Sequence, residues 1–291
     1  MRWPRPVPAG LRTRAGEELL LRVAGPAARQ RRARIHGAPG PRWFEPGRPI
    51  RTVHADASMY VGGLAALLLQ SLHPVAMAAV WAHSGFRGDP WGRLQRTSTF
   101  LAVTTFGTAQ DAEQAVLRLR GVHERIAGVT AGGVVYRASD PHLLGWVHSA
   151  ETECFLRAYQ RYGRRPLDGP GQDGYVADMA YVARRLGAEG PPESRAELTA
   201  RLHAYRGELR PTAESRATTG YLLSRPPLPG AVRVPYALLA AAAAGLLPRR
   251  VRAELGLPLA VRLLLPVAGP GGRLVTAAIR WVTPPLPSSA T

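Results

Sequence analysis

The segment DPWGRLQRTSTFLAVTTFG, residues 89–107, carries the start and stop signals of one helix and decides the fold class. Asp89 supplies an N-cap oxygen. Pro90 follows at the first helical position, where a missing backbone N–H costs nothing. Gly107 provides a stop signal at the other end. The segment therefore predicts a helix that begins at Pro90 and ends before Gly107.

Segments on both sides of this helix also show helical patterns. Residues 109–126 carry apolar side chains at three- and four-residue spacing, the period of an amphipathic helix: Ala112, Val116, Leu119, Val122 and Ile126. Further helices are expected over residues 59–70, 75–82, 141–163 after the Asp140-Pro141 cap, 174–186, and from the capping box Ser194–Glu197. Glycine-proline loops at residues 164–172 and 187–192 separate them. With no alternating strand pattern of useful length, the sequence predicts an all-α, single-domain fold.

Charge and proline divide the chain into three parts. All 38 basic residues are Arg, and the net charge of +18 is distributed as +9 over residues 1–51, +1 over residues 52–205 and +8 over residues 206–291. The same three parts hold 8, 7 and 12 prolines. We expect residues 1–51 to form a basic N-terminal extension packed on or near the core, 52–285 a helical domain, and 286–291 a C-terminal tail.

Several protein classes are excluded by composition. One cysteine, Cys154, rules out an intramolecular disulfide framework and any Cys-x-x-Cys site. The absence of Lys excludes Schiff-base chemistry and the phosphate-loop lysine, and no G-x-S-x-G elbow is present. The longest apolar run, residues 236–247, is too short for a membrane span, and no secretory signal is visible. A cytoplasmic location is the expectation.

Three polar side chains of residues 90–106 share one side of the predicted helix. Arg93, Arg96 and Thr97 fall along this side together with Phe100. In an Arg-rich protein such a stripe is often simply solvated. Two guanidinium groups and a hydroxyl could also hold an anion such as a phosphate or a propionate. The sequence leaves both interpretations open.

Two histidines lie on predicted helices that face the core. His123 follows Leu119 by one turn on the apolar stripe, with Arg120 one turn before it. His148 lies three residues before Glu151, so the two could pair. A histidine on an apolar face is usually a hydrogen-bonded core residue, and otherwise a ligand. His73 and His83 lack the His-x-x-x-His spacing, so a zinc or di-iron site is weakly supported.

Short sequence blocks resemble the family of MpaB-type oxygenases and latex-clearing rubber oxygenases. They occur in family order as HP (residues 73–74), HSGFRGDPWGRLQRT (83–97), FGT (106–108), RGVH (120–123), DPHLLGWVH (140–148) and AYQRYG (158–163). The resemblance implies a globin-like helical core around haem b and O2-dependent oxidation of a hydrophobic substrate, for example an isoprenoid. By motif, His123 would be the proximal iron ligand with Arg120 as its neighbour. His148 would lie near the haem, and Arg93, Arg96 and Thr97 would form the distal block.

The chain departs from the rubber oxygenases at two points. Those enzymes carry Lys where this chain has Arg96, and a guanidinium that stays protonated is a poor iron ligand. A lysine-ligated closed state is therefore not expected. They also use a distal glutamate base, and no matching acid precedes Asp89 on the apolar segments, while Asp89 itself is better used as a cap.

Three functions remain to be compared. The first is a haem-dependent oxygenase that uses O2 on a small hydrophobic substrate. The alternative is a non-catalytic haem- or lipid-binding protein that associates with a membrane surface through its basic flanks. Specific nucleic-acid binding ranks last, because the flanks lack aromatic residues interleaved for base stacking.

Overall fold

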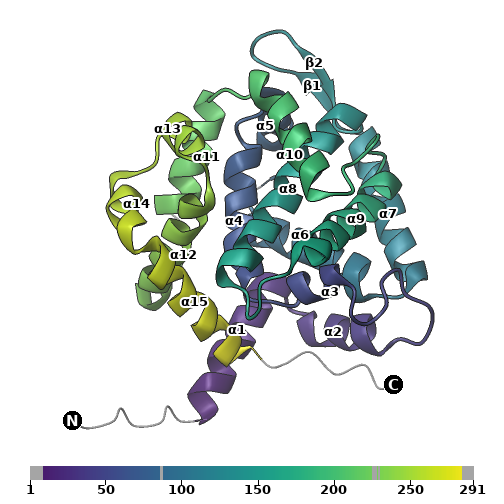
Figure 1. Ribbon diagram of the computed structural model, residues 1–291, viewed down its shortest axis with the longest axis vertical. Coiled ribbons are helices and arrows are strands. Elements are labelled where there is room, and N and C mark those ends of the chain that lie inside the picture. The colour runs from purple at the N-terminus through teal and green to yellow at the C-terminus, as the bar shows by residue number, and fades with distance from the viewer. Residues whose placement is uncertain (1–8, 86–87, 225–227, 229, 284–291) are drawn as a thin grey trace.

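The computed structural model describes residues 9–85, 88–224, 228 and 230–283. Phe86 and Arg87 of the motif block at residues 83–97 lie outside the described residues, as does the tail expected at residues 286–291. The described chain is almost entirely helical, with one short β-hairpin at the top of Figure 1. The all-α prediction is confirmed, whereas the globin-like arrangement stays a prediction.

The elements follow one another in a simple order. The helices are α1 Ala9–Ala24, α2 Ala28–Gly37, α3 Pro49–His54, α4 Ser58–Gln70, α5 Pro74–His83, α6 Pro90–Phe106, α7 Ala109–Glu124, α8 Pro141–Tyr162, α9 Gly169–Leu186, α10 Arg195–Ala204, α11 Ala213–Ser224, α12 Arg233–Leu246, α13 Arg249–Leu255, α14 Leu259–Leu264 and α15 Ala268–Val282. Short 3-10 turns are η1 Tyr205–Gly207, η2 Gly230–Val232 and η3 Leu265–Val267. The strands are β1 Ala127–Val129 and β2 Val135–Arg137, which pair antiparallel.

The expected caps form at the helix starts. Asp89 Oδ1 accepts a hydrogen bond from Gly92 N at 2.8 Å, and Asp140 Oδ1 accepts one from His142 N at 2.8 Å. Ser194 Oγ likewise accepts from Glu197 N at 3.2 Å. The reciprocal half of this capping box is shifted by one residue, because Glu197 Oε2 accepts from the backbone of Glu193. Local side-chain chemistry therefore fixes where these helices begin.

Two of the differences from the sequence expectation lie in the middle of the chain. The loop expected over residues 164–172 is shorter, because Asp168 Oδ1 caps the chain by accepting from Gly171 N at 2.8 Å and α9 begins at Gly169. The hairpin β1–β2 was not expected, since strands of three residues are too short to show alternation. Gly128 suits its position opposite Tyr136, because a Cβ there would lie 2.5 Å from the Tyr136 hydroxyl.

The core is built around α4 and α8. These helices pack closely because Gly62 lacks a side chain, and a Cβ at that position would lie 2.9 Å from the Phe155 ring. Trp146, Leu68 and Leu72 are fully buried beside them. The C-terminal helices α12 and α15 cover one flank of this pair and lie together in Figure 1.

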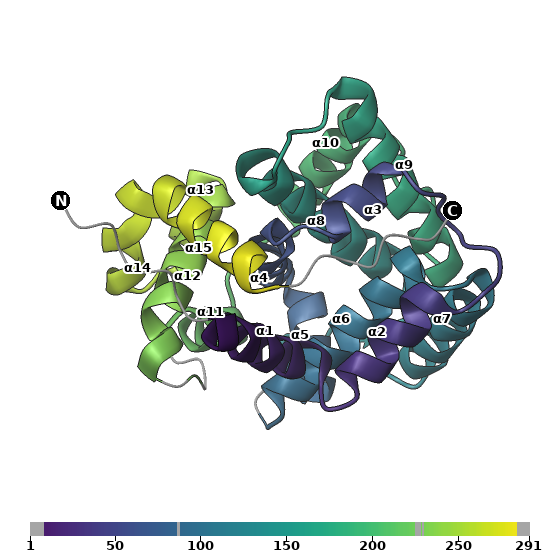
Figure 2. The same ribbon diagram turned by 90° about the horizontal axis from the view of Figure 1, so that it is seen from below.

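Four helices from the first half of the chain lie on another side of the molecule (Figure 2). Seen from below, α1, α2, α6 and α7 lie together on one side of the molecule, and α4 and α8 lie nearer its centre (Figure 2). α1 packs on both α6 and α15. An ion pair joins α15 to the start of α4, with Arg280 Nη2 2.7 Å from the Asp56 carboxylate. Within the described residues no single helix has the length and apolar composition of a membrane span; α4 and α5 pass that test only together, bent by 110°.

Candidate functional site

The three polar residues predicted on α6 have different environments. Arg93 is half-buried and donates a hydrogen bond from Nη1 to Ser84 Oγ at 3.3 Å. Burial, with Arg96 nearby, lowers the pKa of Arg93 from its ordinary value. Arg96 and Thr97 are exposed, and Arg96 Nη1 lies 3.6 Å from the Asp89 carboxylate. Of these three residues, only Arg93 is therefore partly buried.

His123 lies near the end of α7 and is half-buried. Its Nδ1 is buried and has no hydrogen-bond partner. Burial lowers the pKa of His123, so its imidazole is neutral at neutral pH, which is the form that binds a metal. Arg120, one turn before it, is exposed. An orphaned buried ring nitrogen in a native fold needs an explanation, and a missing ligand is one.

His148 on α8 is buried and shares this property. Its Nε2 has no hydrogen-bond partner, and burial, with Arg201 and Arg184 nearby, lowers its pKa to about 4. The pairing with Glu151 considered from the sequence is not present, because no hydrogen bond joins the two side chains. His148 is thus a neutral histidine, and Glu151, three residues later in the chain, is not its hydrogen-bond partner.

Glu151 is a further candidate, which the sequence did not single out as a functional acid. Burial raises its pKa to about 7, although the side chain keeps part of its surface accessible. A carboxyl group with this pKa exchanges its proton near neutral pH, as general acids and bases do. The sequence signal for Glu151 was weak, because it consists of one carboxylate that follows the apolar run of residues 143–147 by one helical turn.

One side of α4 and α8 is left partly exposed, although both helices are otherwise deeply buried. The partly exposed residues of α4 recur at three- and four-residue spacing, and α8 carries further exposed or partly exposed residues. Gln70 joins the two helices here, because its Nε2 donates to the Val147 carbonyl at 3.0 Å. We call this surface the inner face; it consists of Tyr60, Gly63, Leu67, Gln70, Val147 and Glu151.

Within the described residues, α6 and α7 do not pack over the inner face. α6 packs on α1, α3 and α7, and α7 packs on α6 and α9. Across the described part of the chain, neither helix forms an extensive contact with α4 or α8. Two helix pairs are therefore present: α4–α8, with a partly exposed inner face, and α6–α7, which carries Arg93 and His123.

Comparison with known proteins identifies the group to which the chain belongs. Residues 51–281 match the family model described as ER-bound oxygenase mpaB/B'/Rubber oxygenase, catalytic domain. The chain belongs to this family. The matched region is described as the catalytic domain of oxygenases, enzymes that use O2.

Two mycobacterial proteins, each described as an uncharacterized protein, are similar to part of the chain. They are protein Mb2261 of Mycobacterium bovis and protein Rv2237 of Mycobacterium tuberculosis, each 32% identical over 117 residues. The aligned segment covers 39% of this chain and 40% of each relative. No solved structure matches the chain. The mpaB/rubber oxygenase match is thus the comparison that bears on activity.

The residues of this mpaB/rubber oxygenase domain suit a haem with one histidine ligand. The orphaned Nδ1 of His123 shows a neutral imidazole whose hydrogen-bonding capacity the protein leaves unused. Arg93, on the adjacent helix α6, offers a cation for an anionic group. The donor set, a neutral imidazole and a guanidinium, is appropriate for iron and a propionate.

Proposed function

We propose that the protein is a haem b-dependent oxygenase that uses O2 on a hydrophobic substrate of the isoprenoid type. The observation that carries this proposal is the unpartnered ring nitrogen of His123, in the RGVH block of a chain that belongs to an oxygenase family. The haem would lie between the inner face and the helix pair α6–α7. It would supply the binding and activation of O2.

The residues of α6 and α7 would have distinct roles at this site. His123 would bind the iron as a neutral imidazole, and Arg120 would flank it. Arg93, already half-buried, would hold a propionate or donate hydrogen bonds to a developing negative charge. Arg96 and Thr97 lie one turn further along α6, where they would donate to the substrate side of the site. His148 would support the site from α8.

Glu151 would provide the proton-exchanging group. Its pKa of about 7 lets it hold a proton or release one at neutral pH. It lies one turn from Val147, and both residues belong to the inner face. A carboxyl group beside apolar side chains can exchange protons while the surrounding surface excludes water from a hydrocarbon substrate.

The visible spectrum of protein purified from haem-supplemented cells, before and after reduction, tests the cofactor. We expect a haem spectrum for the wild type, its loss in His123→Ala, and a weaker spectrum in His148→Ala. His203 is an exposed histidine on α10, so His203→Ala is the matched control and should keep the haem. A colourless wild-type protein with helical circular dichroism, which haem added in vitro does not restore, would contradict the proposal. Equal haem content in wild type and His123→Ala would remove the ligand assignment.

Oxygen uptake with an isoprenoid distinguishes catalysis from binding alone. Uptake should fall in Arg93→Ala, Thr97→Ala and Glu151→Gln while the haem content changes little in Thr97→Ala. About two to four orders of magnitude is the expected loss for a lost general acid or base. If the haem-loaded wild type consumes no oxygen with any isoprenoid, the non-catalytic alternative takes its place.

A surface on the C-terminal helices favours that alternative, peripheral contact with a membrane. Consecutive elements α14, η3 and α15 expose the apolar side chains Leu259 (67% exposed), Leu263 (70%), Val267 (45%) and Leu274 (64%). Arg262 and Arg273 are exposed among them. Apolar side chains beside cations are typical of surfaces that bind anionic membranes. This contact predicts salt-dependent binding to anionic vesicles that Leu263→Glu abolishes.

A further inference from the structure

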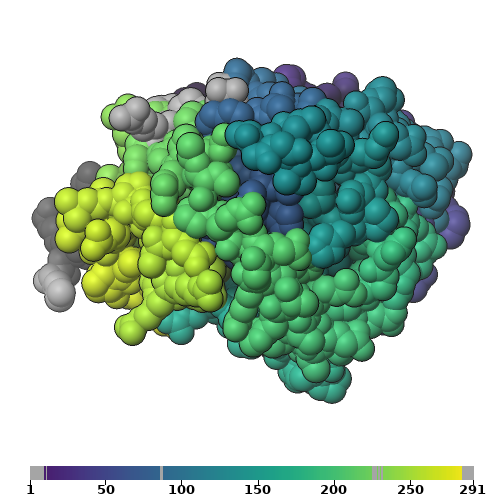
Figure 3. All heavy atoms as spheres, turned by 90° about the horizontal axis from the view of Figure 1, so that it is seen from above, coloured from purple at the N-terminus to yellow at the C-terminus, as the bar shows by residue number. Residues whose placement is uncertain are grey.

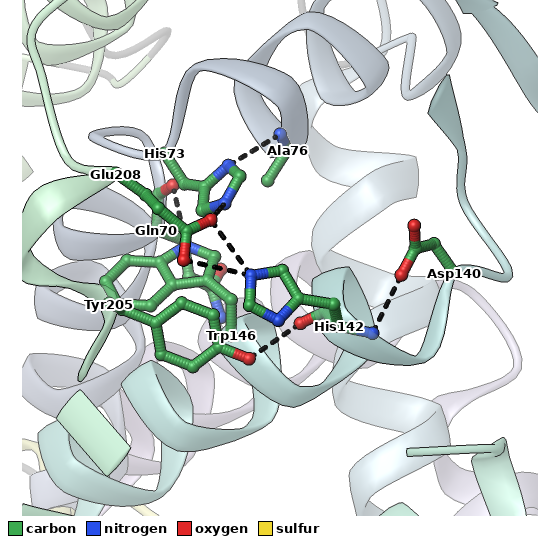
Figure 4. Close-up of polar contacts among 8 residues, drawn as sticks. All are labelled: Gln70, His73, Ala76, Asp140, His142, Trp146, Tyr205 and Glu208. Atoms are coloured by element: carbon green, nitrogen blue, oxygen red, sulfur yellow. Dashed lines mark hydrogen bonds and ion pairs between the residues drawn. The ribbon is translucent and has the colours of Figure 1, made fainter. Parts of the chain in front are cut away.

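Three side chains far apart in the sequence converge where α5 and α8 begin (Figure 4). His73 is the N-cap residue of α5, His142 lies in the first turn of α8, and Glu208 follows η1. Their ligand atoms all lie within 4.8 Å of one another. His142 Nε2 lies 3.0 and 2.9 Å from the two Glu208 oxygens, and His73 Nε2 lies 3.2 Å from Oε2.

We propose that His73, His142 and Glu208 form a binding site for a divalent transition-metal ion of the zinc type. Two imidazoles and one carboxylate are a ligand set common to zinc sites and to other first-row divalent metals. Bond lengths of about 2.0 to 2.2 Å place neighbouring ligand atoms of a tetrahedral site a little over 3 Å apart. The nitrogen–oxygen distances here are already close to that spacing.

The surroundings hold the ligands in position without the ion. Tyr205 donates from its hydroxyl to the His142 carbonyl at 2.8 Å, and its ring lies 4.7 Å from the His142 ring. Trp146 lies beside His73, with ring centroids 5.9 Å apart. The backbone near Glu208 is tied to the chain before His73, since Arg210 N donates to the Leu72 carbonyl at 2.9 Å. Such pre-positioning reduces the conformational entropy lost on binding.

The site has a protected and an open side. His73 is 3% exposed, whereas the side chains of Glu208 and His142 are 40% and 55% exposed. His142, Tyr205 and Glu208 line a surface cleft of about 510 Å³, which Glu197 and Arg201 also border. From above, the blue atoms of α4 and α5 are recessed among teal and green segments (Figure 3). Three protein ligands at the edge of a cleft leave a coordination position open to water or to a ligand.

Ion binding must displace one proton at His73. Its Nδ1 accepts a hydrogen bond from Ala76 N at 3.4 Å, so in the ion-free protein the proton is on Nε2, which donates to Glu208. A neutral imidazole binds an ion through Nε2 only with its proton on Nδ1, so ion binding moves this proton to Nδ1 and breaks the contact with Ala76 N. The hydrogen bond from Ala76 N to His73 Nδ1 is the longest of the cluster. Pro74, at the first position of α5, still favours the helix start when this bond is broken. The proton is therefore a weak competitor for the ion.

Calorimetric titration of the full chain with Zn²⁺, and the visible spectrum with Co²⁺, test the proposal. We expect one ion of each metal per chain at this site and no binding of Mg²⁺, which prefers oxygen ligands. Glu208→Gln and His142→Ala should each weaken Zn²⁺ binding about tenfold or more and abolish the Co²⁺ d–d bands. The exposed-histidine variant His203→Ala should bind as the wild type does.

Equal Zn²⁺ affinity in wild type, Glu208→Gln and His142→Ala would overturn the proposal, as would a wild-type chain that binds no Zn²⁺. Both ligand substitutions are at partly exposed side chains, and helical circular dichroism checks that the variants fold. The result is independent of the haem proposal: His123→Ala should bind Co²⁺ as the wild type does, and Glu208→Gln should retain haem. Each proposal can thus fail alone.

Discussion

The helix pairs α4–α8 and α6–α7 differ sharply in how completely they are packed. In α8, 14 of 22 residues are buried, and in α4, 8 of 13. In α6 only 3 of 17 residues are buried, and in α7 only 2 of 16. Two of the blocks that carry the oxygenase resemblance, RLQRT and RGVH, lie on the loosely packed pair. The proposed iron ligand and anion-binding arginine therefore belong to the loosely packed pair, whereas Glu151 and His148 belong to the tightly packed one.

This difference follows from what each pair contacts. α4 and α8 pack on each other and on α12, and Gly62 permits their close approach. α6 and α7 pack on peripheral helices and leave side chains such as His123 and Arg93 half-buried. Functional sites often lie where packing is incomplete, because a site must keep room and unpaired polar groups for its ligand.

The largest expected effect is a difference in stability between the two pairs. Leu68→Ala on α4 removes a fully buried side chain, and we expect a loss of about 2 to 5 kcal/mol in the free energy of unfolding. Leu117→Ala on α7 is the matched substitution at a side chain that is 57% exposed, and it should cost less than about 0.5 kcal/mol. Denaturant unfolding of the two variants measures both values. Equal losses would show that the pairs are equally packed.

A smaller effect concerns the pH dependence of stability at the inner face. Burial raises the pKa of Glu151 from 4.5 to about 7 in the folded state. The folded chain therefore holds this proton over a range where the unfolded chain has lost it, so stability falls as pH rises from about 4.5 to 7. We expect the free energy of unfolding of the wild type to decrease by about 2 to 3 kcal/mol over this range. Glu151→Gln, which cannot ionise, should not show this decrease.

Unfolding of wild type and Glu151→Gln at pH 5 and pH 7.5 measures this difference. His148 contributes in the opposite direction, since its lowered pKa makes stability rise with pH between about 4 and 6.5. That contribution is common to both proteins and cancels in the comparison. The same decrease with pH in both proteins would show that Glu151 is not desolvated.

The helix starts at Asp89, Asp140 and Ser194 could be predicted from the sequence, whereas the polar clusters could not. Asp89, Asp140 and Ser194 act on backbone groups two or three residues away, so their effect is local. Glu151 owes its raised pKa to burial by distant parts of the chain. His73 and Glu208 are separated by 135 positions and meet only because η1 returns to the start of α5. Side-chain type and spacing carry no information on such meetings.

The charged parts of the chain can be compared with the residues that match the oxygenase family. The mpaB/rubber oxygenase match spans residues 51–281, so it includes the electrically neutral middle of the chain and most of the basic C-terminal part. α1 of the basic N-terminal part contacts α6 and α15. Most of the net charge of +18 therefore lies outside the neutral middle, which holds the few residues on which the proposed chemistry depends.

Gly63 provides the most direct test of whether the space between the two helix pairs holds the haem. It lies on the inner face, and a Cβ there would meet only the Phe155 ring edge, at 3.8 Å, so a larger side chain can be accommodated at the backbone. The measurement is the haem content per chain of Gly63→Leu, with Gly220→Leu on α11 as the control, since a Cβ at Gly220 meets nothing within 4 Å. We predict that Gly63→Leu folds but loses haem while Gly220→Leu retains it. Full haem content in a folded Gly63→Leu would contradict a haem site at the inner face.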